Sequence, residues 1–132
     1  MSKIDKLAAL RGLENMLREI EAPIPRAKRV EMEKLTGAAL SKDDASSFYL
    51  AAGLGGELMG AGAAVALVER LIPDARMTFE SHMSLDGRRW SARIESRLMD
   101  AGAQSDFCPS QGVAAAVALV RVLQRAGRKG PE

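Results

Sequence analysis

Residues 76–98 read RMTFESHMSLDGRRWSARIESRL, and apolar and polar side chains alternate along them in two runs. A period of two predicts half-buried strands, and the Asp86-Gly87 pair between the runs favours a tight hairpin turn. A two-residue loop at Asp86-Gly87 determines which side chains lie opposite one another. The resulting pairs join apolar to apolar and acid to base: Met83 with Trp90, Phe79 with Ile94, and Glu80 with Arg93.

Helical periodicity precedes the hairpin. Apolar residues recur at helical spacing in four stretches: 3–21, 26–39, a short helix from 41, and a helix from 61 that ends before Pro73. Ser2 with Asp5, and Ser41 with Asp44, have the spacing of capping boxes, which satisfy free N–H groups at a helix start. The sequence therefore predicts a helical region before the first strand.

A strand and a helix are predicted after the hairpin. Gly102–Cys108 indicates a shorter third strand, and Pro109 and Ser110 open an alanine-rich helix that Gly127 would cap. Helices, then an antiparallel sheet, then a helix are typical of an α+β fold. We expect N-terminal helices, a three-stranded (at least two-stranded) antiparallel sheet containing the 76–98 hairpin, and the C-terminal helix packed on that sheet.

The length of 132 residues fits a single domain, 1–132. Within it we expect a helical N-terminal part at 1–40, an α-β-β-(β)-α core at 41–127 and a frayed tail at 128–132. Only 4% of the residues are aromatic, whereas 22 are alanine. The core must therefore consist mainly of Ala, Val, Leu and Met.

Several kinds of chemistry are disfavoured by composition. The chain has a single cysteine, Cys108, which excludes an intrachain disulfide. Cys108 and the single histidine, His82, provide too few of the four Cys or His ligands that are typical of a structural zinc site. The chain has no G-x-S-x-G nucleophile elbow, and His82 falls on the outward face of the first predicted strand. We therefore expect no catalytic residues, no metal and no cofactor, and a protein that is not an enzyme.

One glycine-rich stretch and two apolar stretches have other possible interpretations. GLGGELMGAG at 53–62 fits neither the dinucleotide nor the P-loop pattern, so close helix packing or a hinge is the favoured reading. The uncharged runs at 58–68 and 112–120 fall short of the roughly 20 residues that cross a bilayer, and no targeting segment is visible at the N-terminus. We expect buried helices, no membrane partner and a location in a bacterial cytoplasm.

The net charge of +2 conceals an uneven distribution. Residues 87–132 carry eight Lys or Arg against four Asp or Glu, whereas residues 45–86 carry two against five. The candidate binding residues for nucleic acid or another partner are four arginines of the second strand and its turn: Arg88, Arg89, Arg93 and Arg97. Such a row can contact phosphates. Because Glu80 and Glu95 neutralise part of it and no exposed aromatic side chain is expected beside it, a salt-bridged, solvated face is the competing interpretation.

Three segments resemble a known family: AAVALVERLIPDA at 63–75, DGRRWSARI at 86–94 and SQGVAAAVALVRVLQRA at 110–126. They resemble small phage and prophage proteins with an α-β-α "phage ABA sandwich" domain, in which a helix leads into a strand, a second strand carries an aromatic residue and an alanine-rich helix closes the domain. LAALRGLENMLREIEAP at 7–23 is similar to the family's opening, and RAKRVEMEKLTGAAL at 26–40 to its second helix. The family is uncharacterised, so the resemblance implies an origin in a mobile genetic element and no mechanism.

Three functional hypotheses follow from these observations. The leading one is a non-enzymatic phage or prophage accessory protein that binds a macromolecular partner, such as a component of a host defence system. The second is a nucleic-acid-binding module that uses the arginine-rich strand 88–97. The third is self-association, because a small three-stranded sheet leaves a face or an edge that a second copy would cover in a homodimer.

Overall fold

The computed structural model describes residues 3–19, 26–51, 61–85 and 87–129. The described elements follow one another as α1 (Lys3–Arg18), α2 (Arg26–Ala39), α3 (Lys42–Ala51), α4 (Ala61–Leu71), β1 (Arg76–Ser84), β2 (Gly87–Ser96), β3 (Ala101–Gln104) and α5 (Gln111–Lys129). The three strands form one antiparallel sheet in the order β1-β2-β3. The predicted α+β class is confirmed.

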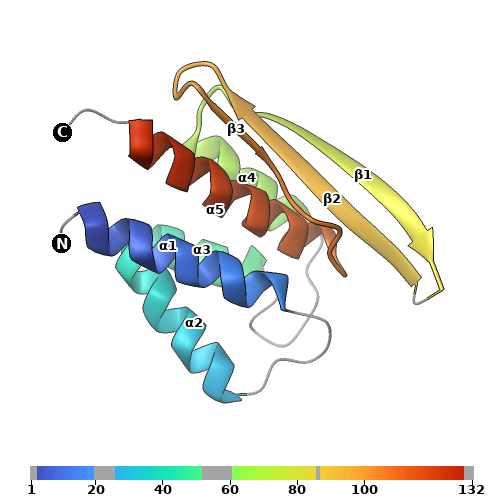
Figure 1. Ribbon diagram of the computed structural model, residues 1–132, viewed down its shortest axis with the longest axis horizontal. Coiled ribbons are helices and arrows are strands. Elements are labelled where there is room, and N and C mark those ends of the chain that lie inside the picture. The colour runs from blue at the N-terminus through green and yellow to red at the C-terminus, as the bar shows by residue number, and fades with distance from the viewer. Residues whose placement is uncertain (1–2, 20–25, 52–60, 86, 130–132) are drawn as a thin grey trace.

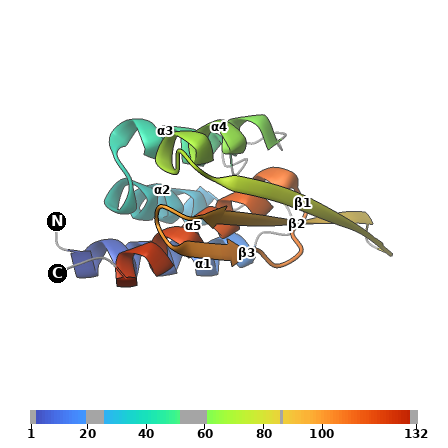
Figure 2. The ribbon, with the colours of Figure 1, turned by 90° about the horizontal axis from the view of Figure 1, so that it is seen from above.

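The described helices all lie on one face of the sheet (Figures 1 and 2). Helix α5 packs on β2 and β3 with one side and on α1 and α4 with the other. The opposite face of the sheet has no described helix over it (Figure 1). The C-terminal helix therefore packs on the sheet as predicted. We call the second face, which no described element covers, the open face.

Helix α5 is the centre of the core. Its residues 112–120 are all buried, since β2, β3 and the helices α1, α3 and α4 all contact α5. Small Ala and Val side chains suit such a position because they let neighbouring backbones approach closely. The helix continues through Gly127 to Lys129, so the prediction that Gly127 caps it is wrong. Of the tail that was expected to fray, 128 and 129 are helical, and 130–132 lie outside the described residues.

The hairpin forms, but its register differs from the predicted one by two residues. Ser84 pairs with Gly87, which brings Trp90 opposite Ser81 and places Met83 opposite Arg88. Gly87 has a φ of 113°. It is the first residue after the turn, whereas the prediction made it one of the two central residues of the turn. Glycine adopts such a positive φ without a steric penalty. A slip of two residues leaves every side chain on its predicted face, because the side-chain period of a strand is also two.

The segment after the hairpin is shorter and less regular than predicted. Strand β2 ends at Ser96, and the chain turns through 97–100 with Asp100 at a φ of 48°. The third strand covers 101–104 where 102–108 was expected, and Cys108 forms only an isolated bridge with Trp90. The interruption lies at Ser105, whose hydroxyl accepts the Ala92 N–H in place of a backbone carbonyl.

The start of α3 agrees with the prediction, whereas α1 ends at Arg18, short of the predicted 21. The Ser41 hydroxyl accepts a hydrogen bond from the Asp44 N–H at 3.3 Å, as in a capping box. The other predicted capping box includes Ser2, which lies outside the described residues. Most of the glycine-rich stretch, residues 53–60, also lies outside them. No helix in the described part of the chain is long and apolar enough to span a bilayer.

Candidate binding surface on the open face of the sheet

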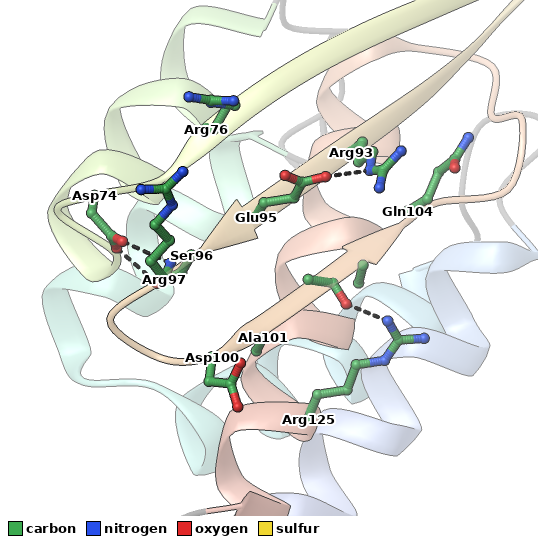
Figure 3. A pocket seen from close by; sticks show the side chains of 12 residues that line it. Asp74, Arg76, Arg93, Glu95, Ser96, Arg97, Asp100, Ala101, Gln104 and Arg125 are labelled. Atoms are coloured by element: carbon green, nitrogen blue, oxygen red, sulfur yellow. Dashed lines mark hydrogen bonds and ion pairs between the residues drawn. The ribbon is translucent and has the colours of Figure 1, made fainter.

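The open face of the sheet contains two adjoining hollows that share Arg93 and Gln104. The larger has a volume of about 970 Å³ and lies where β1 begins, β2 ends and β3 begins. Figure 3 shows its lining, which is mostly charged: Asp74, Arg76, Arg93, Glu95, Arg97, Asp100 and Arg125. The smaller, of about 280 Å³, extends along the middle of β1 and β2. We call the two together the open-face groove.

Two of the four predicted arginines line the open-face groove. Arg93 points outward from β2, and its Nε lies 2.7 Å from a carboxylate oxygen of Glu95. Arg97 lies one residue beyond the end of β2, in the turn to β3, and its side chain also lines the larger hollow. Both therefore belong to one surface, as the alternation of the strand predicted.

The other two predicted arginines lie elsewhere. Arg89 is on the outward face near the hairpin end, where its Nη1 donates to the carbonyl of Phe107 at 3.4 Å. Arg88 has the opposite parity, so it projects from the covered face, donates to the Ser81 hydroxyl at 2.7 Å and lies 6.0 Å from the centre of the Trp90 ring. Arg88 is not part of the groove.

The structure adds Arg76 and Arg125 to the groove. Arg76 is at the start of β1, directly opposite Glu95, and the same alternation that placed Glu80 outward would have identified it. Arg125 comes from α5 and reaches around β3, where it donates to the carbonyl of Gly102 (Figure 3). No local pattern relates a residue of the last helix to the sheet face, so Arg125 required the tertiary structure.

The side chains of Arg76 and Arg97 differ from those of Arg93 and Arg125 because neither guanidinium has a hydrogen-bond or ion-pair partner among the residues that the structure describes. The backbone of Arg97 is nevertheless held in place. Asp74 accepts hydrogen bonds from the N–H groups of Leu98 and Arg97 and from the Ser96 hydroxyl, at 3.0, 2.8 and 2.7 Å. The bond from Leu98, then those from Ser96 and Arg97, keep the pKa of Asp74 below its ordinary value. Asp74 therefore positions the turn and not the guanidinium, which stays available to a ligand.

Arg121 is one of the four basic residues of α5, and its side chain holds the fold together. Its guanidinium donates to Glu14 at 2.9 Å, to the carbonyl of Gln104 at 2.6 Å and to Asp106 at 3.2 Å. Burial acts to raise the pKa of Glu14 and of Asp106, but hydrogen bonds and the charges of Arg121 and Arg18 outweigh it, so both pKa values are lowered. The uneven charge seen in the sequence is thus partly neutralised by the N-terminal helix.

An aromatic pair lies on the outward face at the other end of the hairpin. The His82 and Phe107 rings have their centres 5.8 Å apart at an angle of 57°, and Phe107 is 42% exposed. The prediction that no exposed aromatic side chain accompanies the arginines is therefore wrong. The alternation did not reveal it because Phe107 belongs to the irregular segment after β3.

Cys108 is buried at the end of that segment, next to Trp90. Burial, followed by the charge of Asp106, raises the pKa of its thiol to about 11. A nucleophilic cysteine needs the opposite shift, because the thiolate is the reactive form. In the described segments, no three His, Cys, Asp or Glu side chains are grouped in a way that could hold a metal ion.

Comparison with protein-family models, with curated proteins and with solved structures gives no match for this chain. We therefore infer function from the chemistry of the open face.

Proposed function

We propose that this chain is a non-enzymatic binding protein whose open-face groove holds an acidic surface of a partner protein. The observation that carries the proposal is the pair of guanidinium groups of Arg76 and Arg97, which face the larger hollow and have no partner among the described residues. A guanidinium at a groove binds carboxylates in a planar, two-pronged geometry.

The carboxylates of the groove favour a protein partner over a uniform polyanion. Glu95 and Asp100 line the same hollow as the arginines, and Glu95 is within 2.7 Å of Arg93. A nucleic acid has a negative phosphate at every nucleotide, so wherever it lay along the groove its phosphates would be repelled by these carboxylates. A protein surface with mixed charges can place its own cations opposite them. The lining of the larger hollow is also mostly charged, whereas small-molecule sites are lined mainly by apolar side chains.

The experiment compares capture of proteins from a bacterial host extract by the wild-type chain and by the double variant Arg76→Glu, Arg97→Glu. Replacing each arginine removes a charge-assisted hydrogen bond of about 1.5–3 kcal/mol, so affinity should fall at least tenfold per residue. Arg11→Glu, at an exposed position on α1, is the matched control and should capture the same proteins as the wild type. Equal capture by the double variant and the wild type would refute the proposal.

The phage or prophage origin and a host defence component as the partner rest on the resemblance of 63–75, 86–94 and 110–126 to the phage ABA sandwich family. Such a partner would be met in the bacterial cytoplasm. Identifying the captured protein by mass spectrometry, with capture repeated from an extract of a strain that lacks it, tests this part separately. Capture of housekeeping proteins alone would leave the groove a binding site and remove the defence role.

Nucleic-acid binding remains a second candidate because of the His82–Phe107 pair. Exposed rings on the same face as arginines can stack on unpaired bases. Titration with single-stranded DNA and RNA at 50 and 200 mM salt tests this candidate. Binding that weakens steeply with salt and is lost in Phe107→Ala supports it. Absence of binding at 50 mM salt rejects it, and a nuclease-resistant captured protein favours the first candidate.

A further inference from the structure

Strand β1 forms one edge of the sheet and is unusually regular for an edge strand. All nine of its residues pair with β2 without interruption, and it contains neither proline nor glycine. Natural edge strands are commonly short, bulged or covered, because a long free edge pairs with other chains. Strand β3, at the opposite edge, has only four residues, and Arg121 and Arg125 donate to its carbonyls at 104 and 102.

The backbone groups that β1 presents at its free edge follow from the hydrogen bonds of β2. Trp90 and Cys108 exchange two backbone hydrogen bonds, and the carbonyl of Ala92 accepts one from the N–H of Ser105. The backbone N–H and C=O groups of the even-numbered residues of β2 therefore point toward β3. Because the hydrogen-bonding direction of the backbone alternates along a strand, the N–H and C=O groups of the odd-numbered residues of β2 point toward β1. Their partners on β1 are the even residues, such as Glu80 opposite Ser91. The N–H and C=O groups at the free edge therefore belong to the odd residues of β1: Met77, Phe79, Ser81 and Met83.

We propose that a second copy of this chain pairs with this edge, β1 against β1 in antiparallel orientation, centred on Ser81. In this arrangement Ser81 lies opposite its own copy, and the side chains on either side of it complement each other in two kinds of pair, each occurring twice by symmetry. On the covered face Phe79 meets Met83 of the second copy, and on the open face the Glu80 carboxylate accepts a hydrogen bond from His82 of the second copy. All six backbone groups of 79, 81 and 83 find partners.

Neighbouring registers lack this complementarity. In a symmetric antiparallel pair, opposite side chains must lie on the same face of the sheet, so the two-fold axis must pass through a residue position. The nearest alternative registers are therefore centred on Glu80 and on His82. Centring the pair on Glu80 places Glu80 opposite Glu80, and centring it on His82 places His82 opposite His82. Like charges directly opposite each other are unfavourable, and two opposed histidines leave neither ring facing the carboxylate of Glu80. The register centred on Ser81 is therefore preferred on both sides.

Exposed apolar side chains support the same register. Met83 is 60% exposed although it lies on the covered face, because the hairpin extends beyond α5 at this end (Figure 1). Pairing centred on Ser81 brings Phe79 of the second copy against it. The result is a six-stranded sheet with an open-face groove on each copy, and the groove arginines Arg93 and Arg97, one strand away from the edge, stay accessible.

The first test measures molar mass by light scattering while the concentration rises from 1 to several hundred micromolar. A single strand pair is a small interface, so we expect a dissociation constant on the order of micromolar. His82→Glu places carboxylates opposite each other and should weaken the dimer at least tenfold. The double variant Glu80→His, His82→Glu restores opposite partners and should recover it. A monomer at the highest concentration, or a double variant as weak as the single one, would overturn the proposal.

The second test locates the two-fold axis. Opposite residues of a backbone-bonded antiparallel pair have Cα atoms about 5.5 Å apart, within the range of a disulfide. Ser81→Cys should therefore form a covalent dimer with oxidised glutathione. Thr78→Cys, equally exposed on the same strand, would lie far from its copy and should stay monomeric. Equal cross-linking of the two variants would indicate random collisions and contradict the register.

Discussion

The two edges of the sheet end in different ways. At β3, α5 lies alongside, and Arg121 and Arg125 donate to the carbonyls of Gln104 and Gly102. At β1, the close helix contacts that cover β2 and β3 have no counterpart among the described elements. The comparison shows how position decides the use of a residue type: arginines from the central helix close one edge, whereas arginines on the strands face solvent.

The largest difference should come from proline at adjacent residues of β1. The Glu80 N–H faces β2, so Glu80→Pro removes a ladder hydrogen bond and should cost about 3 kcal/mol or more. The Ser81 N–H is at the free edge, so Ser81→Pro should cost about 1 kcal/mol or less. Urea unfolding followed by Trp90 fluorescence, at submicromolar concentration to keep the chain monomeric, measures both. Equal losses would contradict the assignment of the free edge.

Removing the guanidinium that closes the β3 edge should have the next largest effect. Arg121→Met breaks the bonds to Asp106 and to Gln104, and it leaves Glu14 partly buried without its cation. We expect a loss of about 2–3 kcal/mol. Arg97→Met, on the open face, is the matched control and should change the free energy of unfolding by less than about 0.5 kcal/mol. Similar losses in the two variants would remove the distinction between the edge-closing and the groove arginines.

Acid should weaken the closed edge. The folded pKa values of Glu14 and Asp106 are lowered from 4.5 and 3.8, so their contribution is complete above these values and is lost as pH falls through the folded pKa values. Unfolding free energies measured from pH 7 to pH 3 should therefore decline below about pH 4.5. Glu14→Gln should be less stable at pH 7 and show a shallower decline. An unchanged slope in the variant would show that the Glu14–Arg121 pair is not responsible.

The smallest effect is expected for Arg125, whose side chain is exposed. Arg125→Ala removes one hydrogen bond to the carbonyl of Gly102, which water can replace, so the loss should be below about 1 kcal/mol. Arg11→Ala provides the baseline for an exposed helical arginine. If Arg125→Ala matched Arg121→Met, closure of this edge would depend on both arginines equally.

The residues of the hairpin show which part of the surface the sequence could predict. Alternation correctly placed Arg93 and Glu80 on one face and Phe79 and Ile94 on the other, since side-chain direction is a property of each strand alone. The register came out wrong by two residues, because Gly87 follows the turn and is not one of its two central residues. The geometry of the turn depends on how both strands pack. The pattern of residue types along the hairpin does not contain that information.

Helix α2 shows the same limit within a helix. Val30 is a large apolar residue of this helix, yet it is 45% exposed. The buried side instead includes Thr36, whose hydroxyl donates to the carbonyl of Met32 at 2.6 Å. A polar residue can be buried at little cost once its hydrogen bond is made within the helix. Composition alone does not reveal that bond.

The sequence by itself determined the α+β class, the order of the elements, the faces of the hairpin strands and the capping of α3, because these depend on periodicity and on contacts a few residues apart. The tertiary structure decided which arginines share a surface. Arg121 finds Glu14 across 107 positions of the chain, and Arg125 reaches the sheet face from the last helix. Charges act through space, so their partners follow from packing. Packing also closes one edge of the sheet and leaves the other without a neighbour among the described elements.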